Sequence, residues 1–200
     1  MLHTEGPEAW RSAFRIELRT EAVDLALRGW PVFPGSYPGS GEWRGPQPVT
    51  DDWRRGVRVD AKAVAEKWHE EPYSVLVATG TVVDAVEVDA ELGRAAAGLL
   101  RAEDRPAPIL AMPNGRWIFL TASGPELPAQ LANRPGVVHH GKESWVPLPP
   151  SPYPGGIVHW RVKPEVWGWK LPHAAAVHGV LARAAGLVDG AQARLQPSAA

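Results

Sequence analysis

Apolar residues recur along the chain at two characteristic spacings. Spacings of three and four residues are typical of a helix with one buried face, and they predict helices over residues 11–28, 61–69, 92–102 and 174–187. Short apolar runs bounded by Gly, Pro or Asn are typical of strands, and they predict strands over residues 74–79, 82–88, 109–112, 116–120, 137–140, 144–146 and 157–162. The mixture predicts an α+β fold, with a mixed or antiparallel sheet flanked by helices.

Local signals mark where several of these elements begin, turn and end. Asp60 is suited to cap the second helix, and Val59 with Val64 could form a hydrophobic staple there. Asn114-Gly115 between two apolar runs predicts a hairpin. Residues rich in Gly, Pro and Ser predict loops over 35–48, 124–135 and 147–156. We expect one domain over residues 1–170, followed over 171–200 by a C-terminal helix and a tail that frays from Gln192.

Two acidic residues, Glu87 and Asp89, stand at the end of the strand predicted over 82–88. Residues two apart on a strand share a face, so both carboxylates are expected on one side of the sheet. Such a pair is costly to bury unless it binds a cation or is otherwise paired. One interpretation is a Mg²⁺ or Mn²⁺ site that receives a nucleoside triphosphate. The alternative is a solvated pair that Arg116 or water satisfies, and Asp84 is expected to be a turn or surface carboxylate.

Other polar residues offer further candidates for binding. His139 and His140 are neighbours on a predicted strand, so at most one of them can face the acidic pair. An imidazole there would favour manganese, zinc or other transition metals, while the alternative is a partly exposed structural histidine. A basic stretch with Arg54, Arg55 and Arg58 predicts a DNA-backbone contact or, alternatively, a solvated turn.

Composition narrows the classes of function. The net charge of −1 gives no global attraction to nucleic acid, and the absence of cysteine excludes disulfides and thiol nucleophiles. No apolar run approaches the roughly 18 residues of a membrane helix, and residues 1–10 lack an apolar signal segment. We therefore expect a cytoplasmic protein with no membrane partner. Ten tryptophans indicate either a Trp-based core or base stacking, and the abundance of Ala, Gly, Pro and Arg suggests an actinobacterial origin.

A series of segments occurs in an order that resembles one protein family. In chain order these segments are Ala26–Pro34, Thr50-Asp51, Glu66–Trp68, Val75–Gly80, Val86–Asp89, Asn114–Phe119 and Trp145–Ser151. Together they resemble the N-terminal domain of bifunctional DNA primase/polymerases, in the archaeo-eukaryotic primase superfamily. The resemblance covers about residues 22–160 and implies a primase/polymerase-like fold that binds DNA and nucleoside triphosphates.

The resemblance also implies roles for individual residues. Glu87 and Asp89 hold the positions of the family's metal-binding, catalytic acidic pair, with Glu in place of the more usual Asp. The family's Gly-Arg-His motif, whose histidine contacts nucleotide phosphates, here ends in Arg116-Trp117. Those two residues and Ser151, in the segment that in the family often reads Ser-x-His, are the nucleotide-binding residues that the resemblance implies.

The same comparison reveals departures from the family pattern. Val138 stands where the family has an aspartate that supplies a further metal ligand, Tyr153 replaces the histidine of Ser-x-His, and Trp117 could fill the nucleotide pocket. Two-metal nucleotidyl transfer needs several oxygen ligands, so we expect catalysis to be weak or absent.

Three functions remain open from the sequence. The first is a catalytically degenerate primase/polymerase-like protein with a nucleotide-binding, DNA-binding or regulatory accessory role. The second is an active metal-dependent nucleotidyltransferase in DNA replication whose site is rebuilt around Glu87, Asp89 and one of His139 or His140. The third is a module that binds a protein partner and no nucleotide.

Overall fold

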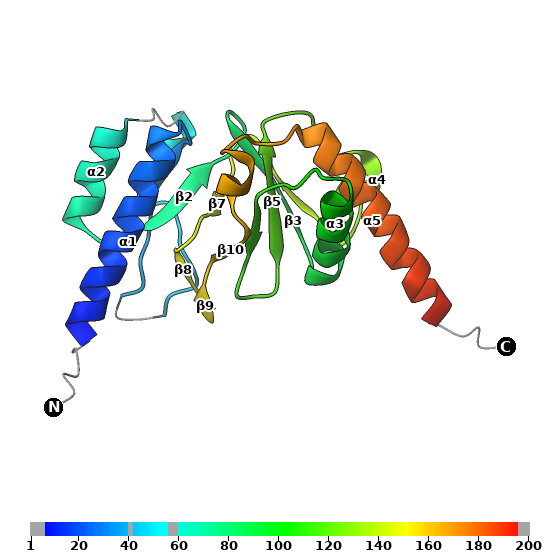
Figure 1. The fold of residues 1–200 in the computed structure, drawn as a ribbon. Coiled ribbons are helices and arrows are strands. Elements are labelled where there is room, and N and C mark those ends of the chain that lie inside the picture. The colour runs from blue at the N-terminus through cyan, green and yellow to red at the C-terminus, as the bar shows by residue number, and fades with distance from the viewer. Residues whose placement is uncertain (1–6, 40–41, 56–59, 196–200) are drawn as a thin grey trace. The chain divides into compact units, whose positions relative to one another are not determined.

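The computed structural model describes residues 7–39, 42–55 and 60–195 (Figure 1). By its internal contacts the chain divides into two units, each assembled from two separate stretches of sequence. Unit 1 comprises residues 1–78 and 145–159, and unit 2 comprises residues 79–144 and 160–200. This division does not separate a C-terminal piece at residue 170.

Unit 1 combines two helices with a small antiparallel sheet. Its helices are α1 (Pro7–Leu27) and α2 (Ala61–Glu70), which pack against each other. Its sheet has the order β1 (Val32–Gly35), β2 (Ser74–Ala78) and β7 (Trp145–Pro147). A 3₁₀ helix, η1 (Asp51–Arg55), and a short two-stranded ribbon, β8 (Pro152–Tyr153) with β9 (Gly156–Ile157), complete the unit.

The helices of unit 1 form where the apolar spacing predicts them. Leu18, Ala22 and Leu25 lie on one face of α1 and are completely buried. Asp60 caps α2, because its carboxylate accepts a hydrogen bond from the Lys62 amide at 3.0 Å. The predicted staple partner Val59 lies outside the described residues.

Unit 2 is built on a five-stranded sheet. The strand order is β10 (His159–Val162), β4 (Ile109–Ala111), β5 (Trp117–Ala122), β3 (Val83–Val88) and β6 (Val138–His140). The pairings of β4 with β5, β5 with β3 and β3 with β6 are all antiparallel. The remaining elements are α3 (Ala90–Ala102), α4 (Ala129–Ala132), η2 (Pro164–Trp167) and α5 (Ala174–Leu195).

Helices α3 and α5 pack against each other and share a hydrophobic core with the sheet (Figure 1). Val86 and Val88 of β3 and Phe119 of β5 belong to this core, together with Leu181 of α5. Because side chains alternate along a strand, Glu87 points to the opposite face of the sheet from these residues. The placement of α5 makes the C-terminal helix part of the core of unit 2.

The α+β class is confirmed, as are the hairpin at Pro113–Gly115 and most predicted elements. Some details were wrong. The predicted loop over 124–135 contains the short helix α4, and the predicted loop over 147–156 contains β8 and the first residue of β9. The strand predicted over 157–162 is divided between β9 and β10. Helix α5 continues to Leu195 rather than ending near Leu187, so the chain is still helical at Gln192, where fraying was expected. Within the described residues, no helix combines the length and apolar character needed to cross a bilayer.

Candidate functional site

The predicted acidic strand places Glu87 between two neighbouring strands of unit 2. Its cross-strand partners are Ile118 on β5 and Val138 on β6. Directly opposite residues in an antiparallel pair point to the same face, so Glu87, Val138 and also His140 lie on one side of the sheet. The position that the family resemblance assigns to a third metal ligand, Val138, is therefore next to Glu87.

Both carboxylate oxygens of Glu87 take part in hydrogen bonds with neighbouring side chains. Oε1 accepts a bond from Nε of Arg116 at 2.7 Å, and Oε2 contacts Nε2 of His140 at 3.0 Å. Each partner is anchored in turn, Arg116 by donating to the Gly136 carbonyl at 2.5 Å and His140 through a 3.1 Å contact between Nδ1 and the hydroxyl of Ser144. We call these four side chains, Glu87, Arg116, His140 and Ser144, the Glu87 network.

The network favours the ionised form of Glu87. The hydrogen bond from His140 is the largest influence, and with the bond and charge of Arg116 it lowers the pKa of Glu87 from its ordinary value, while partial burial opposes the shift. An ionised carboxylate is an acceptor only, so Nε2 of His140 must carry the proton in this contact. The negative charge of Glu87 is thus neutralised within the protein.

Asp89, the second member of the predicted pair, lies just beyond the end of β3. It is the N-cap residue of α3, and its Oδ1 accepts a hydrogen bond from the Leu92 amide at 2.9 Å. A carboxylate at this place stabilises the helix both by satisfying a free amide and by its charge. Asp89 therefore already has a local structural function.

As arranged, these side chains do not fit a divalent cation. Each oxygen of Glu87 already accepts from an N–H group, and a cation there would lie beside the positive guanidinium of Arg116. Over residues 7–39, 42–55 and 60–195, no group of three or more His, Cys, Asp or Glu side chains could hold a metal ion. Binding of Mg²⁺ or Mn²⁺ stays a prediction, and the arrangement of Glu87 weighs against it.

The two neighbouring histidines of β6 point to opposite faces, as their alternation predicts. His140 joins the Glu87 network, whereas His139 lies opposite Val86 on the helical side of the sheet. There its ring meets the ring of His178 from α5 edge to face, with centroids 5.9 Å apart. The Nε2 atoms of both rings are buried and have no hydrogen-bond partner, so His139 is not placed to share a ligand with Glu87.

Two ionisable residues of unit 2, His178 and Asp84, are almost completely buried, each with 2% of its surface exposed. Burial, followed by the charge of His139, lowers the pKa of His178, while the charge of Asp84 acts in the opposite direction. Asp84 accepts hydrogen bonds from the Gly80 amide at 2.8 Å and the Gly124 amide at 2.9 Å. It thus organises a turn, as expected, but its placement at the surface was wrong.

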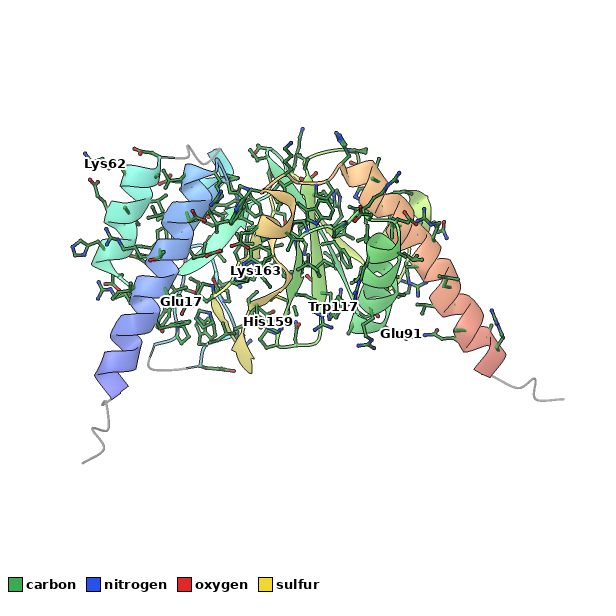
Figure 2. The ribbon with its side chains drawn as sticks, in the orientation of Figure 1. Glu17, Lys62, Glu91, Trp117, His159 and Lys163 are labelled. Atoms are coloured by element: carbon green, nitrogen blue, oxygen red, sulfur yellow. The ribbon has the colours of Figure 1, made fainter. Side chains whose placement is uncertain are left out.

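Trp117 does not lie on the side of the sheet that holds Glu87. It is opposite Val88 and belongs to the core shared with the helices. A Cβ atom built on Gly93 of α3 would lie 2.9 Å from its ring, so only glycine leaves room for the indole at this close approach. Figure 2 shows Trp117 near the beginning of α3, where Glu91 is also labelled. Trp117 therefore does not fill the space beside Glu87.

Ser151, the third predicted nucleotide-binding residue, is completely buried in unit 1. Its hydroxyl accepts a hydrogen bond from the Val75 amide at 2.8 Å and donates to the Val75 carbonyl at 3.1 Å. Both interactions hold the 148–151 turn against β2. This hydroxyl is already occupied, so nucleotide binding by Ser151 stays a prediction.

The predicted DNA patch lies at η1 in unit 1. Arg54 forms an ion pair with Asp51 at 2.8 Å and lies over the ring of Trp53, 5.0 Å from its centroid. Arg55 ends η1, and Arg58 lies outside the described residues. The one described side chain of the patch is thus partly neutralised, and DNA contact there stays a prediction.

Sequence reasoning missed the partners of both histidines of β6. Ser144 orients His140 across a turn, and His178 approaches His139 from a helix that follows more than thirty residues later. Strand alternation could identify which histidine faces Glu87, but no local pattern indicated these two partners.

Comparison with known proteins tests the resemblance. Comparison with curated proteins found none that matches this sequence. The family model of the bifunctional DNA primase/polymerase N-terminal domain matches residues 22–176. This match spans most of the chain, including parts of both units and the whole Glu87 network, and the chain therefore belongs to the bifunctional DNA primase/polymerase N-terminal family.

Proposed function

We propose that this protein uses a primase/polymerase-type fold without catalysing nucleotidyl transfer, and that it acts as an accessory protein that binds nucleotide or DNA. The observation that carries the proposal is the Glu87 network. The carboxylate that would hold a catalytic metal instead forms an ion pair with Arg116 and a hydrogen bond with His140.

The surroundings of Glu87 support the absence of catalysis. Two-metal phosphoryl transfer needs several hard oxygen ligands converging on two cations. The cross-strand neighbour on the same face is Val138, which has no oxygen ligand in its side chain. Asp89 is engaged as a helix cap. Holding two metals would require breaking the Arg116 and His140 contacts and adding ligands that this face does not supply.

Membership of a DNA primase/polymerase family supports DNA and nucleoside triphosphates as the ligand classes. The net charge of −1 provides no overall attraction for a polyanion, so binding would rest on local groups and would weaken with salt. A fold can keep a binding function after its catalytic groups are lost, since function belongs to sites rather than folds.

Template-directed synthesis tests the catalytic part of the proposal. Purified protein is incubated with primed and unprimed single-stranded templates, all four nucleoside triphosphates and either Mg²⁺ or Mn²⁺. We expect no extension and no primer synthesis from the wild type. Metal-dependent incorporation that disappears in Glu87→Ala and Asp89→Ala would overturn the proposal. It would support an active site rebuilt around Glu87 and His140, whose contact at 3.0 Å is the observation that favours this second candidate.

A thermal-shift titration tests the binding part. A ligand that binds only the folded state raises stability by RT ln(1 + [L]/Kd). We expect single-stranded DNA or nucleoside triphosphate to raise the melting temperature equally with and without Mn²⁺, and equally in Glu87→Gln. A shift that requires Mn²⁺ and disappears in Glu87→Gln would favour the rebuilt metal site. No shift with any of these ligands would overturn the binding role.

A further inference from the structure

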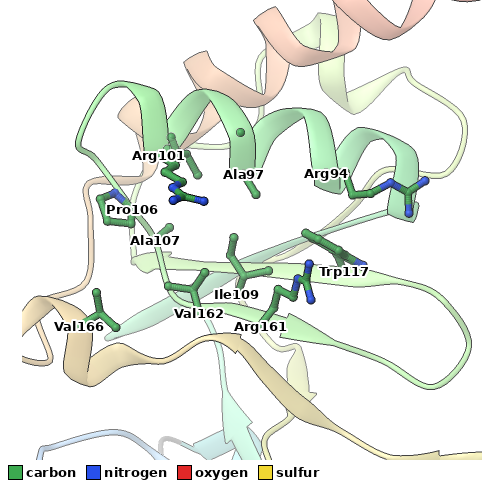
Figure 3. A pocket seen from close by; sticks show the side chains of 12 residues that line it. Arg94, Ala97, Arg101, Pro106, Ala107, Ile109, Trp117, Arg161, Val162 and Val166 are labelled. Atoms are coloured by element: carbon green, nitrogen blue, oxygen red, sulfur yellow. The ribbon is translucent and has the colours of Figure 1, made fainter.

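A second site lies within unit 2, on the helical side of the sheet. A cavity of about 510 Å³ opens between α3, the loop before β4, the edge strand β10 and η2 (Figure 3). Its volume is in the range of small-molecule sites, roughly 300–1,000 Å³. Because Trp117 lines it and points away from the face of Glu87, this cavity is distinct from the site described above.

The floor of the cavity is apolar and combines two alanines with larger aliphatic side chains. Ala97 and Leu100 of α3 contribute from one side, Ala107 and Ile109 from the strand side, and Val162 from β10. Leu100, Ala107 and Ile109 are almost completely buried. A lining of this kind suits an apolar or planar group laid against it.

Three arginines surround this floor, and no acidic residue lines the cavity. Arg94 and Arg101 are seven residues apart on α3, so they lie on the same helical face two turns apart, and Arg161 faces them from β10 (Figure 3). In the described part of the chain, none of the three forms an ion pair with a carboxylate, in contrast to Arg116, Arg134 and Arg183.

Arg161 also links the charged rim to the aromatic end of the cavity. Its guanidinium lies over the ring of Trp117, 5.2 Å from the centroid. This stacking holds the guanidinium flat while its N–H groups remain available for an anion. The position of Trp117 is itself constrained by the close approach of Gly93.

We propose that this cavity binds an organic phosphate, with the phosphate at the arginine rim formed by Arg94, Arg101 and Arg161 and the apolar body lying on the apolar floor. Arginine matches phosphate geometry with paired N–H donors, and three like charges in a lining that contains no carboxylate are complementary to a dianion. The floor offers few polar partners, so the apolar body is recognised by its shape. A nucleoside monophosphate and an alkyl phosphate share this chemistry. The inference does not depend on the proposed function of the Glu87 network.

Isothermal titration calorimetry with three probes tests the proposal. The probes are dAMP, dodecyl phosphate below its micellar concentration, and inorganic phosphate. We expect at least one organic phosphate to bind about tenfold more tightly than inorganic phosphate, because the apolar body contributes through buried area. Binding of dAMP alone would indicate a planar ligand, and binding of dodecyl phosphate alone would indicate an acyl-type ligand. Either result supports the proposal.

Matched variants locate the binding. Arg94→Gln/Arg101→Gln removes two exposed charges from α3 and should weaken binding by roughly tenfold or more. Arg105→Gln removes an exposed charge from the same region outside the cavity and should leave binding unchanged. Gly98 lines the cavity, and a Cβ built there meets no atom within 4 Å. The side chain introduced by Gly98→Leu can therefore occupy the space of the apolar body, and this variant should lose the preference for the organic probe.

Glu87→Ala should bind the probes as the wild type does, which separates this cavity from any ligand at the Glu87 network. The proposal is overturned if no organic phosphate binds, if all three probes bind alike, or if Arg94→Gln/Arg101→Gln binds as the wild type does. Melting temperatures of all variants establish that each remains folded.

Discussion

Removing the carboxylate of Glu87 should destabilise the protein, and this prediction separates a structural ion pair from an empty metal site. Glu87 accepts two hydrogen bonds, at 2.7 Å from Arg116 and 3.0 Å from His140, and its side chain is 22% exposed. A hydrogen bond to a charged group contributes about 1.5–3 kcal/mol. Partial hydration reduces the sum, so Glu87→Ala should lower the free energy of unfolding by about 2–3 kcal/mol.

For a chain of this length, about 1 kcal/mol corresponds to roughly 2–4 °C in melting temperature, so we expect a decrease of about 5–10 °C. The assay is urea and thermal unfolding followed by circular dichroism at pH 7. Hydrogen exchange of peptides from β3 and β6 would show that the loss is local to unit 2. Asp189→Asn is the matched control, because Asp189 pairs with Arg134 at the surface, is 57% exposed and should change stability by less than about 1 kcal/mol.

The opposite result has a clear physical meaning. In a metal site without its cation, two nearby carboxylates repel each other, and removing one of them raises stability or leaves it unchanged. If Glu87→Ala melts at or above the temperature of the wild type, the structural role of the Glu87 network is refuted.

The effect should also depend on pH with a defined sign. The folded-state pKa of Glu87 is lowered, chiefly by His140. Its contribution is therefore fully present above the ordinary carboxyl pKa, about 4.5, and is lost as pH falls below that value. The difference in stability between wild type and Glu87→Ala should shrink on acidification through this range.

Three further predictions concern unit 2. Asp89→Ala should cost about 1 kcal/mol because α3 loses its cap. In α3, Gly93→Ala should lower the free energy of unfolding by about 1–3 kcal/mol, because the added methyl group overlaps the ring of Trp117. At Gly98 an added Cβ meets no atom within 4 Å, so Gly98→Ala should raise the free energy of unfolding by up to about 1 kcal/mol through the higher helix propensity of alanine. Stability should fall as pH decreases below about 6.5, because burial lowers the folded-state pKa of His178 and the unfolded chain binds the proton more readily.

Urea unfolding measures all three. Equal stability of Asp89→Ala and wild type would contradict the capping role, and a stable Gly93→Ala would show that the indole of Trp117 can shift. Replacing His178 by Phe should flatten the pH dependence below about pH 6.5, and an unchanged profile would assign that dependence to another group.

Much of the fold followed from periodicity because its elements are strongly patterned. The spacing of Leu18, Ala22 and Leu25 predicts the buried face of α1, and Asp60 predicts the start of α2. Asn114-Gly115 predicts the hairpin. These signals act within a few residues, where backbone geometry and local hydrogen bonds decide the outcome. The extension of α5 to Leu195 was missed, since Gly186 and Gly190 weaken the helical pattern that packing against α3 sustains.

The candidate site was only partly accessible to sequence reasoning. Alternation along strands predicts that only one of His139 and His140 faces Glu87, and the sequence proposed Arg116 as the partner of the acidic pair if no metal bound. It could not reveal that Asp89 leaves the strand to cap α3, or that Trp117 faces away from Glu87, since a shift of one position in a strand moves a side chain to the other face.

The sequence by itself determined the family, the α+β class and the presence of an acidic strand whose usual catalytic companions are replaced. Tertiary structure alone decided what Glu87 contacts, that Ser151 holds a turn, and that Arg94, Arg101 and Arg161 line one cavity. The physical reason is distance along the chain: periodicity and capping act between near neighbours, whereas the pairing of β6 with β3 and the packing of α3 against α5 join segments that are far apart in the sequence. Register and helix packing then set which side chains come within hydrogen-bond reach.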